Sequence, residues 1–158
     1  MRALPVVTRP DGFDALVVRT DYRDDQAWRN VVAALAEPGG GRQYEAHVHF
    51  VDDPVWAAAT VDEVLAAVCG DDDLAVVFLA DGTTMRAENH ALLAVTTLTR
   101  EECEDDEDYE QLIEFGREFR TVPAAVHDVH ANLSIGNLGF EEYAAWAHDD
   151  PDGTYRSF

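Results

Sequence analysis

Lysine is absent from the sequence, and all eleven basic side chains are arginines. The chain therefore has no residue for a Schiff base, for a lysine-activated nucleophile or for the phosphate-binding lysine of a P-loop. Cysteine is scarce too, because only Cys69 and Cys103 occur and they lie 34 positions apart. Neither a disulfide framework nor a thiolate metal cluster is expected, and we interpret both residues as reduced thiols.

Long apolar runs are also missing. No stretch approaches the roughly 20 apolar residues that cross a bilayer, and residues 1–10 lack the apolar core of a signal peptide. We therefore expect a cytoplasmic protein that does not bind membranes.

Several signatures of enzymes are absent. The glycine run at residues 39–41 follows a predicted helix instead of opening one, so its amides are not positioned to bind a pyrophosphate. No Gly-x-Ser-x-Gly sequence occurs. Asp21 and Asp81 resemble the acidic positions of phosphoacceptor receiver domains, but the lysine of that family has no counterpart here. The sequence thus leaves open whether the protein is an enzyme.

Acidic side chains dominate what is present. The 32 aspartates and glutamates outnumber the eleven arginines and give a formal net charge of -21. A field of this sign repels phosphate backbones and anionic lipid surfaces, so direct binding to nucleic acid or to a membrane is not expected. Basic proteins and cations remain as partners, and a role in solubility alone is the alternative.

Local patterns predict alternating strands and helices. The apolar run at residues 15–18 is typical of a buried strand. Apolar residues at helical spacing then predict a helix from Trp28 to a stop at Pro38 and the glycines that follow. Alternation over residues 44–51 predicts a second strand.

A second helix and a third strand follow. Thr60 and Glu63 have the spacing of a capping box, which predicts a helix start, and Gly70 marks its end. The unbroken apolar run at residues 74–80 predicts a strand covered on both faces, as in the middle of a parallel sheet.

The second half of the chain is less regular. We expect a fourth strand at residues 91–98, a helix with an acidic first turn that ends near Gly116, and a fifth strand at residues 119–122. Residues 126–135 are compatible with an extended or a helical conformation. Apolar spacing from Phe140 predicts a last helix.

The order of these elements predicts one α/β domain over residues 1–158. We expect three layers, with a mostly parallel, doubly wound sheet between the helices. Ligands of such sheets bind beyond the carboxyl ends of the strands. The candidate ligand residues at that rim are Asp21, Asp52, Asp53 and Asp81.

Histidines suggest a metal site. His47 and His49 are two apart on a predicted strand and share a face, whereas His127 and His130 are three apart. Imidazoles at such spacings bind zinc or iron, and an open position would activate water. If the first pair faces solvent on an edge strand, it needs no ligand.

The most acidic stretch is the segment of residues 101–110, with eight carboxylates in ten positions. Such a run is typical of a solvated helix start, and the alternative is a surface that docks a basic partner. The candidate partner-binding residues are Glu101, Glu102, Glu104, Asp105, Asp106, Glu107 and Asp108.

Segments from most of the chain resemble a family of small acidic actinobacterial proteins of unknown function. The similar segments lie at residues 50–54, 78–81, 130–137, 140–143 and 152–158. The resemblance implies no activity and no site. From the residues themselves we favour a non-catalytic binding or regulatory domain that recognises a basic protein or peptide through its acidic surface. The alternative is a metal-dependent enzyme that uses the histidines.

Overall fold

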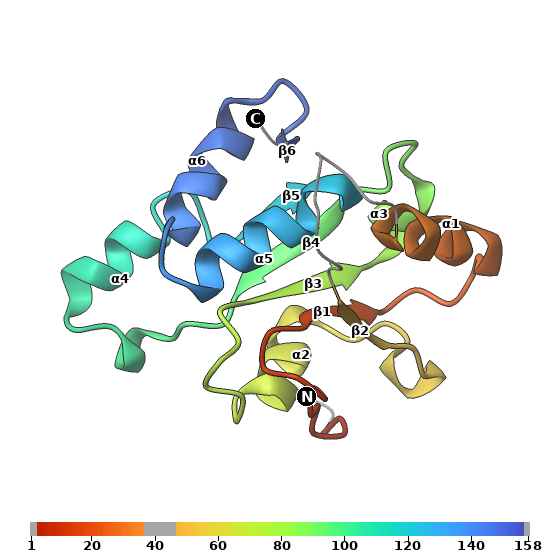
Figure 1. The fold of residues 1–158 in the computed structure, drawn as a ribbon, viewed down its shortest axis with the longest axis horizontal. Helices are drawn as coiled ribbons and strands as arrows, with labels where there is room; N and C mark the ends of the chain where they lie inside the picture. The colour runs from red at the N-terminus through yellow and green to blue at the C-terminus, as the bar shows by residue number, and fades with distance from the viewer. Residues whose placement is uncertain (1–2, 37–46, 157–158) are drawn as a thin grey trace.

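The computed structural model describes residues 3–36 and 47–156, which form a six-stranded sheet with helices packed against it (Figure 1). The strand order is β2-β1-β3-β4-β5-β6. The strands are β1 (Ala15–Arg19), β2 (Val48–Val51), β3 (Val76–Ala80), β4 (Leu92–Thr96), β5 (Glu118–Thr121) and β6 (Thr154–Tyr155).

One helix follows each of the first four strands, and two consecutive helices lie between β5 and β6. The helices are α1 (Asp25–Ala36), α2 (Val61–Val68), α3 (Gly82–Arg86), α4 (Asp106–Leu112), α5 (Val126–Ser134) and α6 (Phe140–Asp149). Three 3₁₀ turns accompany them, namely η1 (Pro54–Trp56), η2 (Arg100–Glu102) and η3 (Pro123–Ala125). The helix stop predicted at residues 38–41 and the start of the strand predicted at 44–51 lie outside the described residues.

The first three strands follow the predicted doubly wound pattern. β1 pairs in parallel with β2 on one side and with β3 on the other. α1 packs with the core cluster that contains Val17, and α2 packs with the cluster that contains Leu16, so these two helices cover opposite faces of the sheet. The predicted capping box is confirmed, because Thr60 and Glu63 bond to each other's backbone amides at the start of α2.

The expectation of a mostly parallel sheet is wrong, because β4 runs antiparallel to both β3 and β5 and the sheet is mixed. The connection between β3 and β4 spans residues 81–91, and it contains only the five-residue helix α3. A parallel return needs a crossover of roughly a dozen residues or more, usually through a longer helix. The chain therefore turns back beside β3.

The end of the chain adds a parallel edge strand. Residues 126–135, which were compatible with either conformation, are helical as α5, and α6 follows the predicted spacing. After these helices the chain enters β6, which pairs in parallel with β5. The sequence predicted neither β6 nor α3, because both are too short to carry a hydrophobic period.

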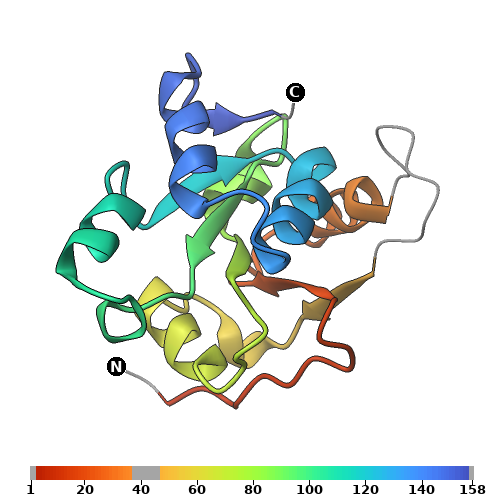
Figure 2. The ribbon, with the colours of Figure 1, turned by 60° about the vertical axis from the view of Figure 1, so that its left-hand side comes forward.

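The buried side chains form two clusters on the two faces of the sheet. All five residues of β3 are buried, and they alternate between the clusters, as the unbroken apolar run predicted. α1 and α5 lie side by side on one face, and α2 lies on the other (Figure 2). No described helix combines the length and apolarity that a membrane crossing requires.

Candidate functional site

The carboxyl ends of β1, β2 and β3 meet at one rim, since these strands are parallel. Strand order reverses between β1 and β3, and a hollow of about 610 Å³ lies there, lined by Asp21 and Asp81 among others. The fold thus brings two of the four candidate rim residues together. Asp52 lines a neighbouring hollow beside Trp28, and Asp53 begins η1.

Both carboxylates at the strand reversal bind arginine. Asp21 is buried and accepts hydrogen bonds from the Arg23 guanidinium at 2.6 Å and from its amide at 2.9 Å. These bonds hold the pKa of Asp21 below its usual value against the opposing effect of burial. Asp81 pairs with both terminal nitrogens of Arg120, at 2.9 and 2.8 Å. Burial raises the pKa of Asp81, but the bonds from Arg120 and Thr84 outweigh it, so the pKa is lowered.

The other two rim aspartates also bond to neighbouring residues. Asp52 accepts from the Trp28 indole nitrogen at 3.1 Å and from Arg19 at 3.3 Å. The Asp53 side chain accepts from the Val55 amide at 3.0 Å and so caps η1. All four predicted rim carboxylates therefore order the loops that follow the strands.

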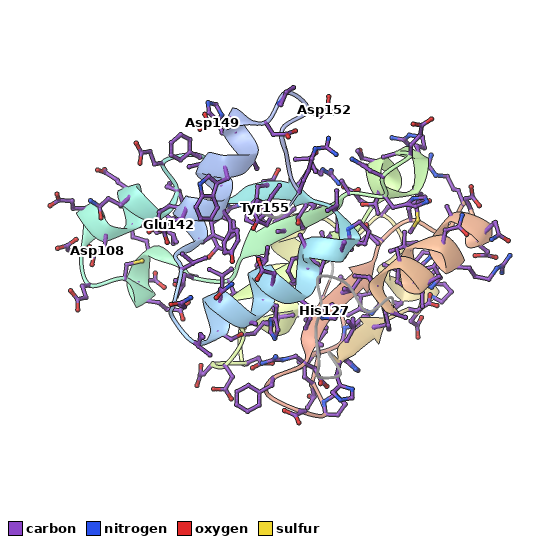
Figure 3. The ribbon with its side chains drawn as sticks, turned by 45° about the horizontal axis from the view of Figure 1, so that its top comes forward. Asp108, His127, Glu142, Asp149, Asp152 and Tyr155 are labelled. Atoms are coloured by element: carbon purple, nitrogen blue, oxygen red, sulfur yellow. The ribbon has the colours of Figure 1, made fainter. Side chains whose placement is uncertain are left out.

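The histidine pairs do not converge. His49 lies on β2 between Val48 and Phe50, whose side chains pack against the α1 face, so His49 projects toward the α2 face. His127 and His130 lie on α5, on the α1 face. Figure 3 labels His127 on this helix. Within residues 3–36 and 47–156, no three histidine, cysteine, aspartate or glutamate side chains are grouped to hold a metal ion.

The second histidine pair bonds to backbone instead. The Nε2 atom of His127 lies 3.0 Å from the Leu35 carbonyl oxygen, at the end of α1. The Nε2 atom of His130 lies 2.9 Å from the Phe13 carbonyl oxygen, in the loop before β1. The two rings therefore join α5 to other segments. The structure does not bring the two histidine pairs together, because the sheet lies between them.

The seven candidate partner-binding residues are all exposed. The predicted acidic first turn is confirmed, because Asp106, Glu107 and Asp108 begin α4. Asp105 is the N-cap of this helix and accepts from the Asp108 amide at 2.8 Å. Glu101 and Glu104 precede α4. Arg100 pairs with Asp106 at 3.0 Å. Asp108 lies on α4 at one end of the molecule, well away from His127 (Figure 3).

A cavity of about 500 Å³ lies between α2 and α4, and we call it the α2–α4 cavity. Its walls come from α2, from the loop before β3, from the chain after β4 and from α4. Residues that represent these walls are Leu65, Val68, Leu74, Leu98, Tyr109 and Arg117. Sequence reasoning missed this cavity, since it exists only because antiparallel β4 brings its carboxyl end to the amino end of β3.

The loop that carries Gly12 and Phe13 forms another wall of the cavity. Arg9 fixes this loop, because its side chain is 1% exposed, pairs with Asp71 at 2.6 Å and donates to the Gly12 carbonyl at 2.9 Å. The hydrogen bonds from Arg9 lower the pKa of Asp71. With His130 bonded to Phe13, the loop is held from two sides. No local sequence pattern marks Arg9 for this role.

The arginines at the cavity are already paired. Arg100 pairs with Asp106 and lies over the ring of Tyr109, with 4.6 Å between guanidinium carbon and ring centroid. Arg117 lies 3.4 Å from Asp62. Asp72 and Asp73 are exposed at the same cavity, and neither forms an ion pair with another described residue. The unpaired charge at the cavity is therefore negative.

A comparison with protein families gives one finding that spans nearly all of these features. The model of the family described as a domain of unknown function (DUF6924) matches residues 14–158. The chain belongs to this family. A comparison with curated proteins found no significant match.

The DUF6924 match includes the rim, the acidic segment and most of the α2–α4 cavity. Arg9, Gly12 and Phe13 precede the matched residues, although Gly12 and Phe13 line the cavity. The membership agrees with the resemblance noted in the sequence and assigns no activity.

Proposed function

We propose that this protein is a non-catalytic binding domain whose acidic segment, residues 101–110, docks a basic segment of another protein. The observation that carries the proposal is the exposure of all seven carboxylates from Glu101 to Asp108. Among the residues that the structure describes, only Asp106 of these seven forms an ion pair. Of the other six, Glu102 accepts hydrogen bonds from Thr99 and Asp105 accepts one from the Asp108 amide, but neither carboxylate is neutralised by an arginine of the described residues.

A role in the helix start alone accounts for four of the seven charges and leaves three unexplained. One carboxylate, that of Asp105, caps α4, and the helix dipole favours acidic residues only within the first turn. Glu101 and Glu104 lie before the helix, so neither effect involves them. Placing like charges this close together costs free energy unless a cation approaches, which supports a basic partner.

The net charge of -21 adds to the local effect. An acidic field over a whole molecule speeds the encounter with a positively charged partner and discriminates against acidic ones. No observation favours the metal-dependent alternative, because His49 projects toward the α2 face of the sheet whereas His127 and His130 lie on α5, on the opposite face.

The test is binding of a basic peptide to a variant in which four carboxylates become amides, D105N/D106N/E107Q/D108N. The probe is a fluorescent, end-capped peptide with two arginines on each side of a central glycine, and the measurement is anisotropy at low salt. Exposed charge pairs contribute roughly 0.5 kcal/mol each, and three of the four carboxylates are not already paired with Arg100, so the Kd should rise by about tenfold. Thermal stability should change little, because asparagine caps a helix start about as well as aspartate does.

The matched control removes the same charges elsewhere, as D24N/D53N/E88Q/D149N, from four residues that are also exposed. If only the net charge of the protein matters, and not the position of the charges, both variants should lose affinity equally. Equal loss, or no loss in the first variant, would overturn the proposal. Affinity of the native chain should also fall between 0.05 and 0.3 M NaCl, because the screening length shortens from about 14 Å to about 6 Å over this range.

A further inference from the structure

We propose that the α2–α4 cavity receives an apolar side chain of the bound basic segment. The partner that fits carries a residue of leucine size or larger, flanked by arginine or lysine. This inference rests on the proposed function and specifies the partner of the same surface.

The acidic segment itself forms part of the cavity wall. Glu102 of η2 and Tyr109 of α4 line the cavity, and Arg100 lies at the start of the segment. A chain that contacts the carboxylates of residues 101–108 therefore passes the cavity mouth. Charge recognition and cavity filling involve one continuous surface.

The inner walls of the cavity suit an apolar group. Leu65 and Val68 of α2 face it together with Leu74 and Ala75 from the chain that leads into β3. Its volume of about 500 Å³ lies within the range of ligand pockets, which are mostly apolar with a few polar groups at the edge. An apolar anchor in a pocket, surrounded by polar contacts, is the usual arrangement of a binding hot spot.

Apolar side chains are also exposed at the mouth. Phe13 is 80% exposed and Leu98 is 41% exposed, and both line the cavity. Contact with an apolar anchor would remove part of this surface from water, which favours binding.

The charges at the cavity favour a bound segment with basic residues next to its apolar side chain. Arg100 pairs with Asp106 and Arg117 with Asp62, so neither arginine among the described residues that line the cavity is free to bind an anionic ligand. Asp72 and Asp73 are unpaired among the described residues and line the cavity from the loop before β3, whereas Glu102 lines it from η2. Arginines that flank the anchor would therefore meet carboxylates from two separate segments of the cavity wall. A second copy of this chain would bring a charge of -21 against the same surface, which disfavours self-association.

A single-thiol variant gives a direct readout of occupancy. Cys69 lines the cavity and is exposed, and Cys103 is the only other cysteine. In C103S, iodoacetamide alkylates Cys69 alone, and its rate is followed by mass spectrometry. Two peptides are compared at equal saturation, the one with a central glycine and the same peptide with a central leucine. We expect the leucine peptide to bind about tenfold more tightly than the glycine peptide. It should also slow the alkylation of Cys69 severalfold more than the glycine peptide does.

Substitution of a residue that lines the cavity tests whether the leucine of the peptide binds there. L98A should reduce the advantage of the leucine peptide over the glycine peptide by at least threefold. The control is V55A, because Val55 is 45% exposed at the other end of the sheet. Both changes affect exposed side chains, so both proteins should melt near the native temperature.

The outcomes separate this inference from the proposed function. If both peptides bind equally and D105N/D106N/E107Q/D108N weakens both, the acidic segment is the binding surface and the cavity inference is wrong. If leucine improves binding but neither Cys69 alkylation nor L98A responds, the anchor lies elsewhere and the inference is also wrong. If the fourfold variant and its matched control bind alike, the proposed function fails.

Discussion

His130 is buried where α5 meets the loop before β1, with one ring nitrogen bonded and the other not. Its Nε2 atom donates to the Phe13 carbonyl, since a carbonyl oxygen only accepts. Its Nδ1 atom is buried without a hydrogen-bond partner among the described residues. Burial lowers the pKa of His130, and the positive charge of Arg9 lowers it further against the effects of the Phe13 carbonyl and Asp14. The fold therefore favours the neutral ring.

Acidification should destabilise the protein through this residue. The pKa of His130 in the folded protein lies below its value of about 6.5 in the unfolded chain. At pH values between these two pKa values, the unfolded chain therefore binds more protons than the folded protein. The stability from neutral His130 is fully present above about pH 6.5 and is lost as pH falls through the folded-state pKa. The melting temperatures of native protein and H130Q, which keeps a donor for Phe13, should therefore converge or cross between pH 7.5 and 5.

H148Q is the control, because His148 is exposed on α6. Its melting temperature should follow that of the native protein over the same range. A constant difference between native protein and H130Q at every pH would contradict the assigned role of His130.

At the scale of elements, β3 shows how burial on both faces follows from sequence. Val77 and Leu79 pack on the α2 side, while Val76 and Phe78 pack on the α1 side. The strand lies between β1 and β4, so its edges are also covered. Every side chain and every edge of β3 is therefore removed from water.

V77D places a charge in this core without a partner. Val77 is 0% exposed, so the substitution should cost at least about 3 kcal/mol and lower the melting temperature by roughly 6–12 °C. Calorimetry measures the change. V6D adds the same charge at a residue that is 78% exposed, and it should melt close to the native protein. A V77D protein that melts within a degree or two of V6D would show that β3 is not central.

The whole molecule carries a charge of -21, which repels itself in the folded state more strongly than in the expanded chain. The arginine pairs, such as Arg120 with Asp81 and Arg9 with Asp71, offset part of this repulsion locally. Most acidic side chains still face solvent, where salt screens them.

Moderate salt should therefore stabilise the protein. Between 0.02 and 0.3 M NaCl the melting temperature should rise, because repulsion over the whole surface is screened more than the few close ion pairs are weakened. D105N/D106N/E107Q/D108N carries four fewer negative charges and should show a smaller rise. Equimolar sucrose tests for effects unrelated to charge. A melting temperature that falls as NaCl is added would contradict this view of the net charge.

Much of the local structure could be predicted because its causes lie close together in the chain. The capping box at Thr60 needs only the amides and side chains of the next three residues. The apolar runs of β1 and β3 are local signals too, because every residue of these two strands is buried. The apolar spacing of α1 is another, because it places the buried residues on one face of the helix. The exposure of the acidic segment also follows from its composition.

The direction of β4, the edge strand β6 and the α2–α4 cavity depended on the tertiary structure. An apolar strand has the same pattern whichever way it runs, so residues 92–96 could not indicate that they are antiparallel to β3. That direction alone brings Leu98 and Arg117 to the cavity. The bonds that shape its wall join residues far apart, with 62 positions between Arg9 and Asp71 and 117 between Phe13 and His130. Hydrophobic period and capping are local, whereas strand direction and such contacts arise only when the whole chain packs together.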